Sequence, residues 1–119
     1  MQENDRVDRH LPVSARDYQI LVSLSQGDAH GYAMVKEIAA RTEDRIVFEP
    51  ANLYRSIRRL IRAGLVEPSE ERPAEESDDE RRRYYRITPL GDGVVRAEAA
   101  RMRELVRDAI ARDILPETE

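Results

Sequence analysis

The sequence predicts a mainly helical α+β domain, in which a small sheet follows three short helices and precedes a long one. Three observations support this fold class. Apolar residues recur at helical spacing in three segments, a segment rich in β-formers follows them, and a longer amphipathic segment comes last. A chain of 119 residues makes one domain with an added helix. Its 40% hydrophobic content suffices for a modest core, although small chains often share a core with a partner.

The first predicted helix spans about residues 14 to 26. Ser14 and Asp17 resemble a capping box at its start, and Gly27 supplies the stop. One side of this helix carries Tyr18, Leu21, Val22 and Ser25. Residues 1 to 13 are highly charged and have no period, so we expect a mobile N-terminal segment there.

The second predicted helix runs from His30 to about Thr42. Its buried face is expected to carry Tyr32, Val35, Ile38 and Ala39, with Met34 and Ile38 as a second pair. The polar link that follows is β-like at residues 46 to 48, which leaves room for a short strand.

The third predicted helix, residues 49 to 63, has one apolar stripe and one cationic face. Pro50 suits its first position and Gly64 suits a left-handed stop. The stripe consists of Leu53, Ile57, Leu60 and Ile61, and the other positions carry Asn52, Arg55, Arg58, Arg59 and Arg62. A packed side opposite a side rich in hydrogen-bond donors indicates a DNA-recognition helix, although an ordinary surface helix with solvated arginines has the same pattern.

A hairpin, or wing, is predicted from the next two β-like segments. The first is residues 65 to 67 and the second is residues 81 to 88. Strand alternation puts Tyr85 and Ile87 on one face, and Tyr84 and Arg86 on the other. Between them, residues 68 to 80 contain Pro68, Pro73 and a run of acids, and we expect a solvated loop.

The last predicted helix runs from Leu90 to about Asp113, capped by Thr88 with Pro89 at its first position and ended by Pro116. A single helix of this length cannot bury its own apolar stripe, and a two-fold partner is the simplest cover. Besides Val94, the stripe holds the residues expected at a dimer interface: Val95, Met102, Leu105, Val106, Ala109 and Ile110. The expected units are therefore a DNA-binding domain at 14–88, a dimerisation helix at 89–115 and a tail at 116–119.

This order of elements is that of a winged helix-turn-helix with a long C-terminal dimerisation helix. Three motifs in matching order resemble the PadR-type transcriptional regulators over about residues 14 to 112. They are His30-Gly31-Tyr32 with Lys36, then Asn52-Leu53-Tyr54-Arg55 with Leu60 and Gly64-Leu65-Val66, then Arg82-Arg83-Tyr84-Tyr85-Arg86-Ile87-Thr88 with Gly91. The resemblance implies a cytoplasmic bacterial repressor that binds an inverted-repeat operator as a homodimer. It also implies that a small-molecule inducer near the dimer interface can release the DNA.

The sequence departs from the family pattern in two places. The third helix of the family often begins Ser-Pro-Gly-Thr, whereas this chain has Glu49-Pro50-Ala51-Asn52. The tip of the wing is acidic, so a basic wing is limited to Arg81, Arg82 and Arg83.

The formal net charge of −4 counts against DNA binding only if charge is spread evenly. Between Glu67 and Glu80 there are eight acids and one base, which leaves +3 for the rest of the chain. Exposed charges more than about 8 Å apart are largely screened at physiological salt. A local basic patch can therefore bind phosphate. The alternative, in keeping with a pI of about 5.3, is a winged-helix protein-interaction module without DNA binding.

The candidate DNA contacts divide by chemistry. Asn52 and Arg55 suit base edges, because Asn pairs with adenine and Arg with guanine through two hydrogen bonds. Tyr54 is expected to pack its ring at the boundary of the helix and to offer its hydroxyl to a phosphate. Tyr32 is either a core residue or a contact. Arg58, Arg59 and Arg62 are expected to meet phosphates or to form ion pairs. The other candidate DNA contacts are Lys36, Arg81, Arg82 and Arg83.

Composition argues against the other function classes. Without cysteine there are no disulfides or thiolate metal sites, which fits the reducing cytoplasm where we expect the chain. No apolar run reaches the ~18 residues of a membrane span, and the opening segment is not expected to be a secretory signal. His30 has only His10 as a second histidine, and the acid run lacks calcium-loop spacing. We expect no metal, no cofactor and no enzymatic activity, because no nucleophile, phosphate loop or carboxylate dyad is recognisable.

Overall fold

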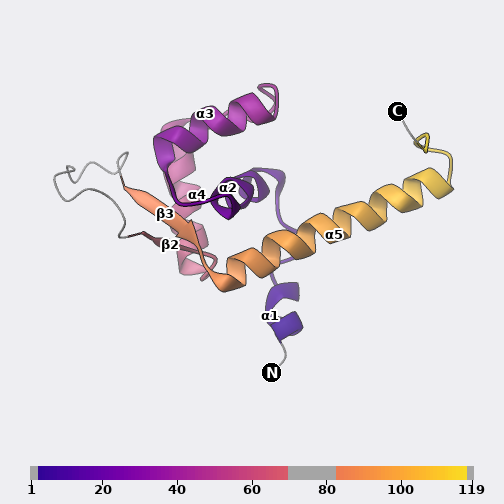
Figure 1. The fold of residues 1–119 in the computed structure, drawn as a ribbon, viewed down its shortest axis with the longest axis horizontal. Helices are drawn as coiled ribbons and strands as arrows, with labels where there is room; N and C mark the ends of the chain where they lie inside the picture. The colour runs from indigo at the N-terminus through magenta and orange to yellow at the C-terminus, as the bar shows by residue number, and fades with distance from the viewer. Residues whose placement is uncertain (1–2, 70–82, 118–119) are drawn as a thin grey trace.

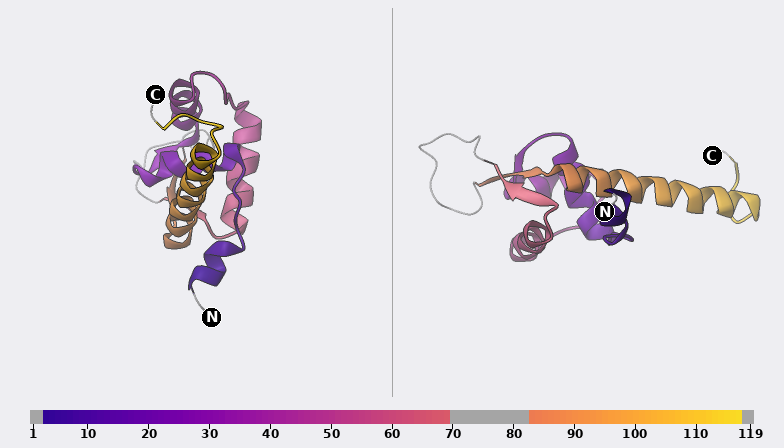
Figure 2. Two further views of the ribbon diagram at one scale, coloured as in Figure 1. Left: turned by 90° about the vertical axis from the view of Figure 1, so that its right-hand side faces the viewer. Right: turned by 90° about the horizontal axis from the view of Figure 1, so that it is seen from below.

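The structure is a computed structural model that describes residues 3–69 and 83–117. Helices α2, α3 and α4 and a small sheet form the body, and α5 runs from the sheet past the body and projects beyond it (Figures 1 and 2). The elements are α1 (Glu3–Asp8), α2 (Ala15–Ser25), β1 (Ala29–His30), α3 (Gly31–Arg41), α4 (Pro50–Arg62), β2 (Val66–Pro68), β3 (Tyr84–Ile87) and α5 (Pro89–Ala111). This architecture confirms the predicted winged helix-turn-helix.

Side chains cap three of the helices at their first turns. Ser14 Oγ accepts a hydrogen bond from the backbone N–H of Asp17 at 3.1 Å, as the capping-box pattern predicted. His30 Nδ1 accepts from the N–H of Ala33 at 3.2 Å at the start of α3. Thr88 Oγ1 accepts from the N–H of Gly91 at 3.0 Å at the start of α5.

The sheet has three antiparallel strands in the order β1-β3-β2. The hairpin of β2 and β3 is as predicted, and Tyr85 faces the core with only 4% exposure. The strand β1 was not predicted. Residues 46–48 form no strand, because Glu43 and Asp44 turn the chain with φ of 54° and 63° and Phe48 enters the core.

The core lies between α2, α3, α4, the sheet and the first half of α5. Met34 and Ile38 are fully buried on α3, whereas Tyr32 is 49% exposed. The expectation that Tyr32 marks the buried face is therefore wrong. The core is formed by Ile20, Leu21, Leu24, Met34, Ile38, Phe48, Leu53, Tyr54, Ile57, Leu60, Leu65, Val66, Tyr85, Val94 and Val95, with Val7 at its edge.

The N-terminal segment contains a helix where the sequence indicated no element. Val7 of α1 is buried, and its side chain lies against α5 at Gly93. Further along, the backbone N–H of Val13 donates to the buried carboxylate of Glu98 on α5 at 3.1 Å. The segment therefore packs along α5, because one apolar residue and one backbone donor find partners there.

Helix α5 begins where predicted but ends earlier than Pro116. Its last residue is Ala111, and Asp113 adopts a left-handed φ of 64°. Near its start, Gly91 allows close approach, since a Cβ there would collide with the carbonyl oxygen of Leu65. Val95 was predicted at a dimer interface, but it is 6% exposed and belongs to the core of its own chain.

None of the helices in the described ranges is long and apolar enough to cross a membrane. Within the same ranges, no three histidine or acidic side chains come together as a metal site requires.

Candidate nucleic-acid interface

Helix α4 buries one side and exposes the other, as its periodicity predicted. Leu53, Ile57 and Leu60 are 4% exposed or less. The opposite face is exposed and carries Asn52, Arg55, Arg58, Arg59 and Arg62. Packing against α3 and the start of β2 therefore fixes which side chains the helix presents to solvent.

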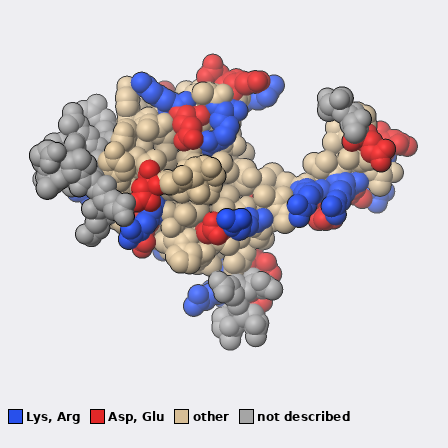
Figure 3. All heavy atoms as spheres, in the orientation of Figure 1, with Lys and Arg blue, Asp and Glu red and all other residues tan. Residues whose placement is uncertain are grey.

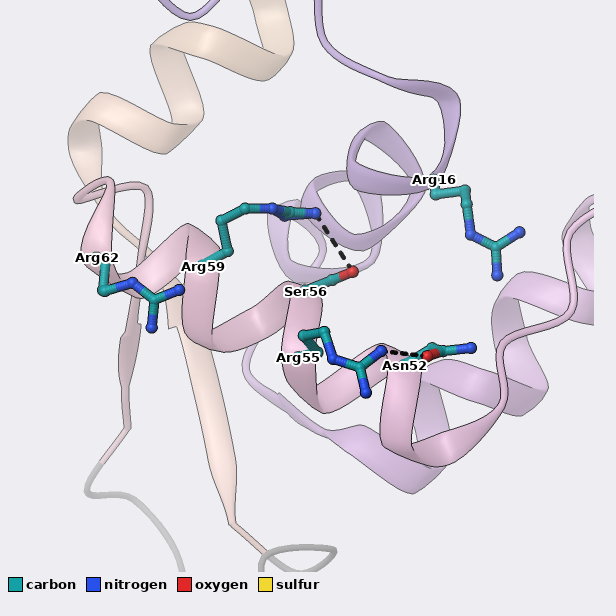
Figure 4. Close-up of a pocket in the computed structure, with 6 residues that line it drawn as sticks. All are labelled: Arg16, Asn52, Arg55, Ser56, Arg59 and Arg62. Atoms are coloured by element: carbon teal, nitrogen blue, oxygen red, sulfur yellow. Dashed lines mark hydrogen bonds between the residues drawn. The ribbon is translucent and has the colours of Figure 1, made fainter.

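A cleft of about 460 Å³ lies between the exposed face of α4 and the first turn of α2 (Figure 4). Its lining is strongly cationic, and four of the six lining side chains are guanidinium groups. The lining residues are Arg16 from α2 and Asn52, Arg55, Ser56, Arg59 and Arg62 from α4. We call this the α2–α4 cleft.

Three of the four arginines in the α2–α4 cleft have no carboxylate partner among the described residues. Arg55 Nη1 donates to the amide oxygen of Asn52, so these two side chains are held side by side. Arg16 lies over the ring of Phe48 at 4.5 Å and donates to the carbonyl oxygen of Val47 at 3.4 Å. Arg62 has neither a hydrogen bond nor an ion pair to any residue in the described ranges. Their positive charge is available to an external anion.

Arg59 is the exception, because it pairs with Asp17 of α2. Its Nη2 lies 3.1 Å from Asp17 Oδ1 and its Nη1 lies 3.4 Å from Asp17 Oδ2. Burial raises the pKa of Asp17 above its ordinary value, although Arg59 and the hydroxyl of Ser14 act in the opposite direction. Burial removes part of the hydration of the Asp17 carboxylate, and contacts with Arg59 replace it.

The N-terminus of α4 adds to the positive potential of the cleft. Glu49 at the N-cap forms no side-chain cap, which agrees with the departure from the Ser-Pro-Gly-Thr pattern. The first N–H groups of a helix have no intrahelical partner and carry the positive end of its dipole. Asn52 and Arg55 follow within the first two turns, so donors of both kinds lie at this end of the helix.

Tyr54 packs its ring at the boundary of α4, as predicted, and its contact with a phosphate through the hydroxyl stays a prediction. It is 7% exposed, and its ring lies against Gly31 at the start of α3. A Cβ at position 31 would lie 2.5 Å from Tyr54 Cε1. Gly31 and Tyr54, which occur in two separate sequence motifs, therefore form one contact that sets the angle between α3 and α4.

The other predicted contacts lie outside the α2–α4 cleft. Tyr32 and Lys36 are exposed on α3, with Lys36 Nζ 5.1 Å from the centre of the Tyr32 ring. Arg58 is exposed on α4 and Arg83 is exposed before β3. Arg81, Arg82 and the acid run at 70–80 lie outside the described residues.

Sequence reasoning found Arg62 on the exposed face of the third helix but missed Arg16 and Ser56. Ser56 follows Asn52 at helical spacing, so periodicity could have found it. Arg16 comes from a different helix, and only the packing of α2 against the rest of the body brings it to the cleft.

Arginines elsewhere in the described residues behave differently. Figure 3 shows basic side chains grouped over the projecting half of α5, with acidic ones beside them. There Arg107 pairs with Glu104 at 3.1 Å and Arg112 pairs with Asp108 at 3.1 Å. Those charges are largely neutralised within the helix, whereas most of the charge in the α2–α4 cleft is not.

The fold and this exposed cationic helix define the class of the protein, which is a winged helix-turn-helix protein. The model of the "Transcriptional regulator PadR-like family" matches residues 20–97. The chain therefore belongs to the PadR-like family of transcriptional regulators, which confirms the resemblance of its motifs. The family is not enzymatic, in agreement with the expectation from the sequence.

Relatives and solved structures agree with this assignment. An uncharacterised protein from Lysinibacillus sphaericus is 33% identical over 91 residues, which cover 76% of each protein. A transcriptional regulator from Clostridium thermocellum is 28% identical, with 91% of this chain and 96% of that one covered and a TM-score of 0.63. Bacillus subtilis PadR in complex with operator DNA is 16% identical, covers 72% of this chain and 47% of that one, and has a TM-score of 0.60. At that identity the last comparison supports the fold alone.

Proposed function

We propose that the chain is a cytoplasmic DNA-binding repressor that recognises an inverted-repeat operator as a homodimer. The observation that carries this proposal is the α2–α4 cleft, where three arginines without a described carboxylate partner adjoin an uncapped helix N-terminus. Phosphate is the anion that such an arrangement binds, through charge-assisted hydrogen bonds and the helix dipole. Membership of a family of transcriptional regulators supports DNA as the source of that phosphate, and Bacillus subtilis PadR, which has the same fold, was solved in complex with operator DNA.

In this proposal α4 enters the major groove with its N-terminal turns toward the bases. Asn52 and Arg55 read base edges, and the hydrogen bond between them restricts both side chains before DNA arrives. Arg16 and Arg62 lie at the sides of the same cleft and contact phosphates. Base contacts then supply specificity, and the flanking arginines supply affinity at every sequence.

The partner that we propose for the projecting half of α5 is a second copy of the chain. Leu105 and Val106 are 56% and 46% exposed, which leaves an apolar stripe in solvent on the part of α5 that extends beyond the body. Met102, Ala109 and Ile110 lie along the same half and are partly buried. Pairing of two such helices would bury the stripe and place two α4 helices about one DNA turn apart, ~34–36 Å.

Induction by a small molecule follows from this arrangement as a further proposal. A ligand bound between the paired α5 helices would change their angle and hence the separation of the two α4 helices. It would release DNA to the extent that it binds the non-binding arrangement more tightly. Candidate ligands are tested by their ability to reverse duplex binding in the assay below.

The test is fluorescence anisotropy with operator duplexes selected from genomic fragments, repeated over a series of salt concentrations. Wild-type affinity should fall linearly with log salt, because each phosphate contact contributes a slope of about −0.9. Arg55→Ala should cost about 1–3 kcal/mol and relax preference at one base position, if Arg55 reads guanine. Arg62→Ala should weaken all duplexes alike.

The matched control for these variants is Arg103→Ala. Arg103 is exposed on α5, so its replacement removes the same charge at a site away from the α2–α4 cleft. Absence of any salt-dependent duplex binding by the wild type would overturn the proposed function. An Arg55→Ala loss no greater than that of Arg103→Ala would remove Arg55 from the base-reading set.

A further inference from the structure

Arg59 is bound end-on by a carboxylate, which distinguishes it from the other arginines of the α2–α4 cleft. Both of its terminal nitrogens point at Asp17, at 3.1 Å and 3.4 Å, and Nη2 also lies 3.5 Å from the hydroxyl of Ser56. The two terminal nitrogens are one pair of donors with which an arginine binds a phosphate bidentately. Asp17 therefore occupies the position that a phosphate bound end-on to Arg59 would take.

We propose that Asp17 is an internal competitor for DNA phosphate at Arg59, and that it lowers the affinity of the protein for duplex DNA at every sequence. This inference rests on the proposed function, since it assumes that the α2–α4 cleft meets DNA. The end-on carboxylate takes one N–H from each terminal nitrogen, so a phosphate that binds the same two N–H groups has to displace it.

The surroundings of the pair favour exchange of Asp17 for an external anion. The side chain of Arg59 is 52% exposed, so water and salt reach the pair and keep it weak. The side chain of Asp17 is only 18% exposed, and burial raises its pKa, so its carboxylate is held at a solvation cost. The two residues lie on different helices, so their side chains can separate while the backbone of α2 and α4 stays in place.

The test compares Asp17→Asn with wild type in anisotropy titrations on a mixed-sequence duplex of about 30 base pairs, which spans two half-sites. Releasing Arg59 adds one phosphate contact, which steepens the salt slope by about 0.9 and tightens binding roughly 8-fold at ~0.1 M salt. Asp44→Asn is the control. It makes the same change in net charge at an exposed residue, and its φ of 63° is one that Asn tolerates.

Two further variants place the effect on Arg59 and guard against misfolding. Asp17→Asn combined with Arg59→Gln removes both charges, and its affinity should return to within about twofold of wild type because the gained contact is lost. Asp17→Ser should reproduce the gain of Asp17→Asn, since Ser is also tolerated in the first turn of a helix. Thermal melting of each variant checks that it is folded.

The inference is overturned if folded Asp17→Asn binds no more tightly than Asp44→Asn, or binds more weakly than wild type as an orienting role would require. That failure is distinct from failure of the proposed function. If only the inference about Asp17 fails, the wild-type protein still binds duplex with a steep salt dependence. If the proposed function fails, the wild-type protein binds no duplex, and both proposals are overturned.

Discussion

Replacing Gly31 by Ala tests whether the contact between α3 and α4 sets the geometry of the recognition helix. A Cβ at position 31 would lie 2.5 Å, 2.7 Å and 2.8 Å from Cε1, the hydroxyl oxygen and Cζ of Tyr54. Ordinary van der Waals contact begins near 3.4 Å, so the ring would have to move by about 1 Å. Because Tyr54 is 7% exposed, its ring has little room to move.

The expected change in the free energy of unfolding of Gly31→Ala is the difference between two opposing effects. Overpacking of this kind destabilises a domain by about 1–3 kcal/mol. Ala is a better helix former than Gly by up to about 1 kcal/mol in a helix interior, but Gly31 is the first residue of α3 and gains less. A net loss of roughly 1–2 kcal/mol lowers the Tm of a chain of this size by roughly 3–10 °C. Duplex affinity should fall as well, because α4 shifts relative to α3.

Thermal and urea denaturation measure the effect, with Gly93→Ala as the matched control. A Cβ at position 93 would lie 3.2 Å from Cγ2 of Val7, a side-chain methyl that can yield, so the control should stay within about 0.5 kcal/mol of wild type. Adding Tyr54→Leu should relieve the collision, so the double variant should be more stable than the sum of its single changes predicts, by roughly 1 kcal/mol. Strict additivity, or a Gly31→Ala variant as stable as Gly93→Ala, would refute the reasoning.

Three further predictions concern α5. Leu105→Asp puts a charge into the exposed apolar stripe and should give monomers in sedimentation velocity; a surviving dimer would place the interface elsewhere. Gly91→Ala should cost more than Gly31→Ala in denaturation, because its Cβ meets the backbone oxygen of Leu65, which cannot swing aside. The hydrogen bond from Arg101 lowers the pKa of Glu98 below its ordinary value of 4.5, so wild type has extra stability above pH 4.5 that is lost as pH falls through the lowered pKa. Glu98→Gln should therefore cost about 1–3 kcal/mol at neutral pH and flatten the acid limb of a stability-against-pH curve.

Local periodicity and capping chemistry predicted most of the fold. Ser14, Pro50 and Thr88 mark the starts of α2, α4 and α5 because their roles at helix ends depend on a few neighbouring residues. The alternation that turns Tyr85 inward is equally local. Asn52 and Arg55 of the candidate site were found in the same way, from the exposed face of one amphipathic helix.

Features that depend on contacts distant in sequence were missed. Strand β1 is two residues long and exists because Ala29 and His30 pair with Tyr85 and Tyr84. Helix α1 packs through Val7 on α5, and Arg16 reaches the cleft only through tertiary packing. The helical spacing of Val95 is compatible with the core of its own chain and with a subunit interface. Only the path of α5 over the body shows that Val95 lies in the core. The burial of Glu98 could not be predicted from the sequence, because a single Glu in an amphipathic helix normally faces solvent.

Thr88 connects the end of α4 to the start of α5 by hydrogen bonds. Its hydroxyl donates to the carbonyl oxygen of Gly64 at 2.6 Å, just after α4 ends, and its backbone N–H donates to that of Leu65 at 3.0 Å. The same hydroxyl starts α5, whose 23 residues extend about 35 Å. A tilt of α5 by about 5° about Thr88 would move its far end by about 3 Å. The near end of the helix is held to the end of α4 by these hydrogen bonds. A partner that held the far end of α5 would therefore also restrict the orientation of α4.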